Sequence, residues 1–271
     1  MIVLVRLVIL VTFLVFGVFV ALGYYLDTIV KTGIEKVGPN ITGTKVSVDD
    51  VDISAMSGEG RIKGLVIGNP KGFHNKNAYE LPDTTIKVDL VSVLFGTLVF
   101  EKIVIDSPEI TYETTFSRNN LDIIQENVEA FGRAQGLTDR DKSRSKKKAR
   151  GGTVQINHLI VKNGKINVTA SLFGGGGITF SLDDIHLRDI GKQSGGVTLA
   201  QATVQALEGT TKPIFKTVNK STNVARSQFE QASKTAEKFK GTAEKRASDM
   251  FDKAKELFGT VSKEVKDRFA K

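Results

Sequence analysis

The sequence predicts a mainly β protein with helical additions: an N-terminal transmembrane helix, a twisted antiparallel β-sheet and a long C-terminal amphipathic helix. Three observations lead to this prediction. An uncharged apolar run opens the chain, short segments of period-two alternation fill its middle, and apolar residues recur every eleven positions at its end. The 271 residues are enough for one sizeable domain or two small ones.

The apolar run at residues 7–26 contains no charged side chain. At about 1.5 Å of rise per residue, it spans the roughly 30 Å hydrocarbon core of a bilayer. Arg6 and the terminal amine precede it, so the positive-inside rule predicts a cytoplasmic N-terminus. A cleaved signal peptide is the alternative, since Ala21-Leu22-Gly23 fits a cleavage site. The length of the run favours a retained anchor, assigned to residues 1–26.

Residues 27–137 are predicted to form the first part of a β-domain. A short amphipathic link at 27–36 leads to strands at 61–67, 84–90, 98–105 and 109–112, separated by glycine and proline. Asn119 or Asn120 then caps a helix that extends to residue 134, with apolar residues at helical spacing.

Residues 153–211 are predicted to form the second part of this domain. Strands at 154–161 and 165–169 flank Asn163-Gly164, which is a strong hairpin signal. Strands at 178–182 and 185–187 follow, and a helix is expected over 197–207. Many short strands with few helices indicate an antiparallel sheet of meander type. Its apolar face needs a cover, which helices, a second sheet or lipid could provide.

Several short pieces of the β-domain occur in a characteristic order and spacing. They are Gly64-Leu65-x-Ile67-Gly68-Asn69-Pro70, Gly72-Phe73, Val88-Asp89-Leu90, Gly96, Ile103-x-Ile105-x-x-Pro108-x-Ile110, Asn120-Leu121, Asp184-Ile185-His186-Leu187-x-Asp189-Ile190-Gly191 and Gly195-Gly196-Val197-Thr198. Together they resemble the N-terminal region of the AsmA family of bacterial envelope proteins. The resemblance covers roughly residues 1–210.

This resemblance implies a single-pass anchor in the bacterial inner membrane and a periplasmic β-sheet of taco- or groove-like shape. It also implies a role in phospholipid transfer or in homeostasis of the outer membrane and cell envelope. The expected ligand is a phospholipid or another anionic envelope lipid, whose acyl chains cost about 0.8 kcal/mol per CH₂ exposed to water. The candidate lipid-facing residues of the groove are Ile86, Val88, Leu90, Ile103, Ile105, Ile178, Phe180 and Leu182.

The expected groove is short. About ten strands at about 4.8 Å give a length of about 50 Å, less than a complete bridge between membranes needs. The alternative is a sheet whose apolar face is simply its own core. The chain would then be a non-transporting envelope scaffold that acts through a coiled-coil tail.

The net charge of +8 is concentrated in two segments. Residues 138–150 carry seven basic and two acidic side chains, and residues 212–271 carry fifteen and eight, so the rest of the chain is mildly acidic. The insert at 138–152 is predicted to be disordered. Its basic patch, Lys146, Lys147, Lys148 and Arg150, would face lipid headgroups or only solvent. No aromatic residue interleaves these bases, so nucleic acid is not the expected partner.

The tail at 212–271 is predicted to be an amphipathic helix, because its 11-residue repeat corresponds to about 3.67 residues per turn. Two interpretations remain open. The helix could lie on an anionic membrane, or it could pair with itself or with a helical partner protein as a coiled coil. The candidate contact residues are Phe239, Met250, Phe251, Leu257, Phe258, Val261, Val265 and Phe269.

The sequence contains no recognisable catalytic constellation. The absence of cysteine excludes a disulfide scaffold, a thiolate metal site and a cysteine nucleophile. His74, His158 and His186 are expected to lie apart, without metal-ligand spacing. The glycine run at 174–177 lacks the context of a phosphate-binding loop. We therefore expect neither an enzyme nor a cofactor.

Overall fold

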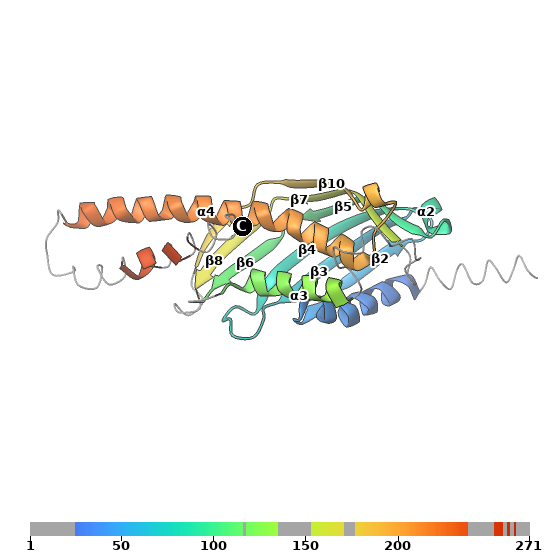
Figure 1. Cartoon of the computed structure of the whole chain (residues 1–271), viewed down its shortest axis with the longest axis horizontal. Helices are drawn as coiled ribbons and strands as arrows, with labels where there is room; N and C mark the ends of the chain where they lie inside the picture. Colours follow the sequence, from blue (N-terminus) through green and yellow to red (C-terminus); the bar gives the residue numbers. More distant parts are fainter. Residues whose placement is uncertain are drawn as a thin grey trace, which may run out of the picture.

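The computed structural model describes residues 25–115, 118–134, 153–170, 177–237, 252–256, 259–260 and 263. Within these residues a ten-stranded sheet carries helices α3 and α4 across one face, and a further helix at residues 25–42 lies at one side of it (Figure 1). The predicted mainly β class is confirmed. The remaining elements are β1 (Val46–Ser47), β2 (Asp50–Ser54), β3 (Glu59–Gly68), β4 (Asn77–Asp89), α2 (Leu90–Leu94), β5 (Thr97–Asp106), β6 (Glu109–Thr114), α3 (Asn120–Ala134), β7 (Thr153–Lys162), β8 (Lys165–Ala170), β9 (Gly177–Ser181), β10 (Ile185–Ile190), a 3₁₀ turn (Lys192–Ser194) and α4 (Leu199–Glu237).

Four pairs of consecutive strands lie end to end, namely β1 with β2, β5 with β6, β7 with β8 and β9 with β10. Together with β3 and β4, the ten strands therefore form only six neighbouring lines. β4 pairs with β5 over most of its length and with β6 at Tyr79 and Glu80. β7 and β8 continue this arrangement beside β5 and β6, and β10 and β9 lie beside β7 and β8. Six lines have five gaps of about 4.8 Å, which makes the sheet about 24 Å wide. This width is about half of what ten separate strands would give.

The prediction of a wholly antiparallel meander is wrong, because β5 pairs with β7 and β6 pairs with β8 in parallel. The chain leaves β6 through α3 and re-enters the sheet in the same direction, as parallel neighbours require. Asn163-Gly164 is not a hairpin either, since β7 and β8 pair with other strands. Asn163 adopts φ 57° in a break between them, next to Ser107, with φ 54°, in the neighbouring line.

These two breaks reset the alternation of side chains along the sheet. Ile105 and Ile110 lie five positions apart, which in a regular strand would put them on opposite faces, yet both contact the same core because the break at Ser107 lies between them. The break at Asn163 has the same effect in β7 and β8. Irregular residues of this kind also bend a strand and increase its twist. The curvature of the sheet in Figure 1 is consistent with such breaks in adjacent lines.

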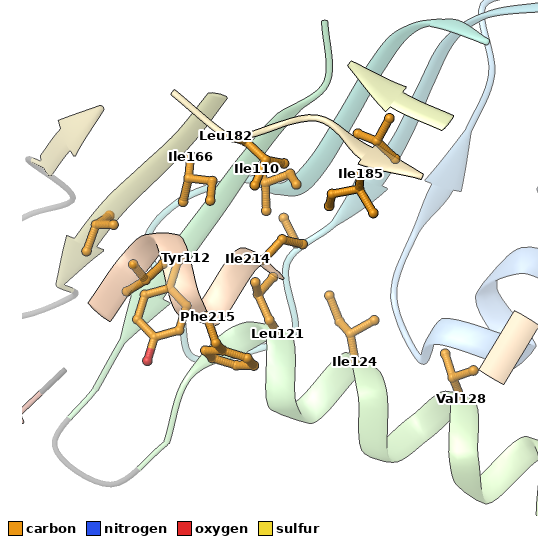
Figure 2. Close-up of a cluster of buried hydrophobic side chains, with 14 residues drawn as sticks. Ile110, Tyr112, Leu121, Ile124, Val128, Ile166, Leu182, Ile185, Ile214 and Phe215 are labelled. Carbon is orange, nitrogen blue, oxygen red and sulfur yellow. The ribbon is translucent and has the colours of Figure 1, made fainter. Parts of the chain in front are cut away.

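The main core lies between the sheet and helices α3 and α4 (Figure 2). Tyr112 of β6 and Phe215 of α4 are almost completely buried, and their rings meet edge to face with centroids 5.7 Å apart. The strands, the two helices and Leu182, which follows β9, complete the buried set, whose other members are Ala78, Ile110, Leu121, Ile124, Val128, Val161, Ile166, Val168, Ile185, Ile214 and Val218. Most of the apolar face is therefore covered by the chain itself.

Helix α4 begins with a reciprocal cap. Thr198 Oγ1 accepts a hydrogen bond from the Gln201 N–H, and the Gln201 side chain accepts one from the Thr198 N–H. The helix then passes the boundary predicted at residue 211 without a break and continues through Pro213. Gly209 permits its close approach to the sheet, because a Cβ there would lie 2.5 Å from Leu187 of β10.

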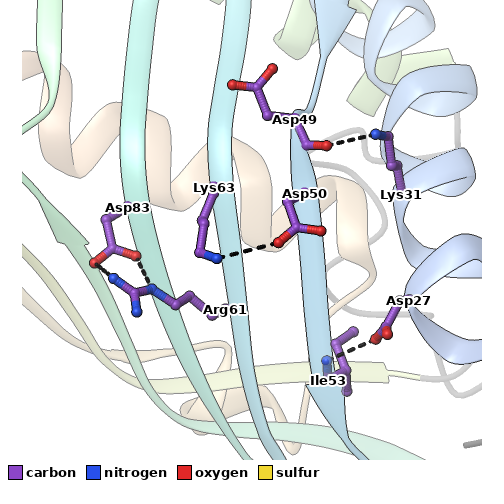
Figure 3. A network of polar contacts seen from close by, with 8 residues as sticks. All are labelled: Asp27, Lys31, Asp49, Asp50, Ile53, Arg61, Lys63 and Asp83. Atoms are coloured by element: carbon purple, nitrogen blue, oxygen red, sulfur yellow. Dashed lines mark hydrogen bonds and ion pairs between the residues drawn. The ribbon is translucent and has the colours of Figure 1, made fainter.

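The helix at 25–42, which the sequence suggested only as a short amphipathic link, protects the edge of the sheet (Figure 3). Asp27 accepts a hydrogen bond from the Ile53 N–H at 2.8 Å, and Lys31 donates to the Asp49 carbonyl at 2.8 Å. Glu35 accepts from the N–H of Val48, which lies between β1 and β2, at 3.1 Å. The three helical side chains are four residues apart and therefore share one face. They satisfy backbone groups that an edge strand otherwise exposes.

Several predictions fall on residues outside the described part of the chain. These are the anchor up to residue 24, the basic patch at 146–150 and all eight candidate contact residues of the tail. Among the described residues, no helix has both the length and the hydropathy to cross a membrane.

Candidate functional site: an apolar strip on β4 and β5

The eight residues predicted to face lipid do not form one open surface. Leu182 is buried in the main core, and Ile105 and Phe180 pack against the same core. Ile178 is exposed at the far end of β9. Leu90 is not in a strand at all, because it is the first residue of α2 and is 40% exposed.

The capping of α2 explains why β4 ends before Leu90. The Asp89 side chain accepts hydrogen bonds from the N–H groups of Val91 and Ser92 and so ends β4. The Ser92 hydroxyl faces the sheet, where it donates to the Asp89 carbonyl and accepts from the Val99 N–H. The alternation of apolar residues before Asp89 had suggested that the strand continues to Leu90.

The other three candidates do lie together. Ile86 pairs with Ile103 and Val88 pairs with Phe100 across β4 and β5. A register shift between Lys87 and Val88 allows Phe100 and Ile103 to reach the same face. All four apolar side chains remain partly exposed. We call Ile86, Val88, Phe100 and Ile103 the β4–β5 strip.

Two separate clusters of buried side chains border this strip. On one side the helix at 25–42 packs Val30 and Ile34 into a cluster that also contacts Ile86. On the other side the start of α4 packs Ala202 into a cluster that contacts Ile103. Thr84 of β4 is 5% exposed and Leu90, the first residue of α2, is 40% exposed, and the half-buried strip residues Ile86 and Val88 lie between them. The strip is therefore most accessible towards α2.

The opposite face of the sheet is charged. Arg61 forms a bidentate ion pair with Asp83, with distances of 2.7 and 2.9 Å, and Lys87 pairs with Glu59 at 3.1 Å (Figure 3 shows the first pair). Several of these residues and Lys102 line an open depression of about 620 Å³. Because charged side chains line this depression and an acyl chain there would displace water from them, it is unsuited to an acyl chain.

Two histidines that we expected to lie apart are neighbours on this charged face. His158 Nδ1 and His186 Nε2 are 3.1 Å apart, because β7 and β10 pair with each other. Burial lowers the pKa of His186, and electrostatic repulsion from Arg188, His158 and Lys102 lowers it further. Among the described residues no third ligand joins the pair to make a metal site.

A buried carboxylate that sequence reasoning missed holds part of the resemblance motif. Glu113 is completely buried, and it accepts hydrogen bonds from the N–H groups of His74 and Asn75 at 2.7 and 2.9 Å and from the Asn75 amide at 2.7 Å. Asn120 donates to the side chain of Asn69 at 2.6 Å. The Asn69-Pro70 and Asn120-Leu121 pieces of the motif therefore lie at one structural joint. No signal in the sequence indicates this burial, because Glu109, Thr111 and Glu113 alternate with Ile110 and Tyr112 as the residues of a solvent-facing side would.

Comparison with protein-family models, with curated protein sequences and with solved structures gives no match. The resemblance to the AsmA family thus stays a prediction that depends on the motif pieces. The geometry of the sheet and its helices is the basis for the function proposed next.

Proposed function

We propose that this chain is a membrane-anchored β-domain that binds an acyl chain of an envelope phospholipid along the β4–β5 strip and thereby assists lipid transfer or envelope homeostasis. One observation carries the proposal. On a face that α3 and α4 otherwise close, Ile86, Val88, Phe100 and Ile103 stay partly exposed between two packed helices. The resemblance to the AsmA family and the uncharged run at residues 7–26 support the same assignment.

The dimensions favour weak and reversible binding of part of one lipid. From Thr84 to its end at Asp89, β4 extends by about 17 Å at about 3.4 Å per residue. Shielding six methylene groups from water would contribute about 5 kcal/mol, from which the cost of association must be subtracted. Such a site suits transient shielding rather than storage.

The same packing argues against a lipid that moves along the whole sheet. The main core fills the space under α3 and α4 with side chains such as Tyr112, Phe215 and Leu121. A continuous channel across these six lines of strands would require α4 to leave the sheet. We therefore propose capture at one end of the domain.

A second function is favoured by α4. This helix has 39 residues and extends well past the sheet (Figure 1). A rod that projects from a domain with its own packed core is the arrangement expected of an envelope scaffold, with the projecting part contacting a partner helix. In this case the strip would be only the incompletely covered border of the core.

Two neighbouring substitutions separate the functions. Ile103→Asp places a carboxylate on the strip, whereas Val104→Asp places one on the opposite, charged face of the same strand. The full chain and both variants would be purified in a mild detergent, checked for folding by circular dichroism, and analysed for bound lipid by mass spectrometry. We expect phospholipid with the unchanged chain and with Val104→Asp, and a loss of it with Ile103→Asp.

Folded Ile103→Asp protein that retains as much phospholipid as the Val104→Asp control would contradict lipid binding by the strip. A chain that purifies folded and without lipid in all three forms would support the scaffold. If Ile103→Asp does not fold, Ile103→Ser gives the same comparison with a smaller polar side chain.

A further inference from the structure

A group of large apolar side chains is exposed on α2 and on the turn between β2 and β3. Met56, Val91, Val93, Leu94 and Phe95 have exposed fractions between 51% and 88%. We call these five residues the α2 patch. Contiguous exposed apolar surface in a folded domain commonly marks a site of contact with a protein or a membrane.

The two parts of the α2 patch are adjacent in the fold. Lys87 Nζ donates to the Ser57 carbonyl at 2.8 Å, and the Gly58 carbonyl accepts from the Val88 N–H at 2.8 Å. A Cβ at Gly58 would touch the Leu90 side chain. The β2–β3 turn therefore packs directly against the start of α2.

The N-terminal apolar segment enters the domain at this same end. The first described turn of the helix at 25–42 bonds through Asp27 to the Ile53 N–H, three residues before Met56 in the sequence. Figure 1 shows this helix beginning at the end of the sheet that carries α2. The further bonds of Lys31 and Glu35 to the link between β1 and β2 hold the direction of the helix relative to the sheet.

We propose that the α2 patch docks on the surface of the bilayer that holds residues 7–24. Tyr25 is 58% exposed and lies near the end of the uncharged apolar run at residues 7–26, and Asp27 is only about 3 Å further along the helix axis. The membrane surface is then within about one helical turn of the contact between Asp27 and Ile53, near the end of β2 that leads into the β2–β3 turn. Ser92 turns towards the sheet while Val91, Leu94 and Phe95 face outward, which is the arrangement of an interfacial element.

Docking would place the accessible end of the β4–β5 strip at the lipid surface. Leu90 joins the two features, since it follows Val88 of the strip and begins α2. The inference rests on the membrane anchoring in the proposed function, but it does not depend on lipid binding by the strip.

The absence of cysteine allows a direct test. Leu94→Cys would carry an environment-sensitive fluorophore in the full chain, reconstituted into vesicles of phosphatidylethanolamine and phosphatidylglycerol that contain nitroxide-labelled lipid. Ile178→Cys is the matched control, because Ile178 is also an exposed apolar residue but lies in β9 at the other end of the sheet. We expect a blue-shifted emission and severalfold stronger lipid quenching at position 94 than at position 178.

Equal and weak quenching at both positions in vesicle-bound protein would overturn the docking while leaving the anchor and the strip unaffected. A shielded fluorophore at position 94 that nitroxide lipid does not quench would also overturn it, in favour of a protein contact. Failure of the chain to float with the vesicles would refute both the docking and the anchor. In a second test, Leu94→Asp with Phe95→Asp should move a fluorophore at Met56→Cys from lipid into water, whereas an unchanged Met56 signal would count against the patch acting as one surface.

Discussion

Replacement of Phe215 by alanine tests whether α4 really closes the apolar face of the sheet. Phe215 is 1% exposed, and its ring meets that of Tyr112 edge to face at 5.7 Å. Its neighbours in α4, Ile214 and Val218, are equally buried. Truncation of a buried phenylalanine to alanine costs about 3–5 kcal/mol, of which the lost aromatic pair accounts for about 0.5–1.5 kcal/mol. We therefore expect Phe215→Ala to lower the free energy of unfolding by about 4 kcal/mol.

This loss is a large part of the 5–15 kcal/mol that typically stabilises a folded domain. Denaturant unfolding of the full chain, followed by circular dichroism because the chain has no tryptophan, would measure it. Phe95→Ala is the matched control, since Phe95 is 82% exposed and its removal should change stability by no more than about 0.5 kcal/mol. If Phe215→Ala is as stable as this control, α4 does not pack on the sheet, and the reasoning for a largely closed face is refuted.

Two further predictions concern polar groups. Glu113→Gln should destabilise the chain by about 1–3 kcal/mol in the same unfolding assay, because the new amide cannot accept from every N–H of His74 and Asn75 that the carboxylate receives; an unchanged midpoint would contradict the buried network. His186 has a pKa below its ordinary 6.5 in the folded chain, so the imidazole takes up its proton at a higher pH in the unfolded chain than in the folded one. The folded state therefore loses stability as the pH falls from above 6.5 towards the folded pKa. His186→Gln should remove that part of the pH dependence of the melting temperature, and parallel pH profiles for the two proteins would show that the prediction is wrong.

The local patterns of the sequence predict most strands and α3, but not how the strands are joined. The spacing of Leu121, Ile124 and Val128 predicts α3, and the structure confirms it. Alternation identifies a strand without naming its partner, so the parallel pairs could not be foreseen. Asn163-Gly164 favours a left-handed backbone conformation in a hairpin and in an in-line break alike, and only the neighbouring strands decide between them.

The residues of the candidate site could be predicted only in part, because alternation along a strand does not show what covers the strand. Ile86 and Ile103 lie on one face because they are direct cross-strand partners, whereas Phe100 reaches that face only through the register shift between Lys87 and Val88. Phe180 and Leu182 follow an equally regular pattern, but they lie in the core because α4 crosses them. Nothing in the strand pattern reveals which part of a sheet a distant helix will cover. The end of β4 at Asp89 depends on a single capping side chain, which the alternation conceals.

The central claim, that lipid lies on the β4–β5 strip, is tested most directly by photo-crosslinking in membranes. A benzophenone amino acid would replace Ile103 on the strip or Val104 on the charged face, in the full chain within phospholipid vesicles, and adducts would be identified by mass spectrometry. We expect phospholipid adducts through an acyl chain at position 103 and few or none at position 104. Equal yields at the two positions, or adducts at position 103 only with protein, would contradict it.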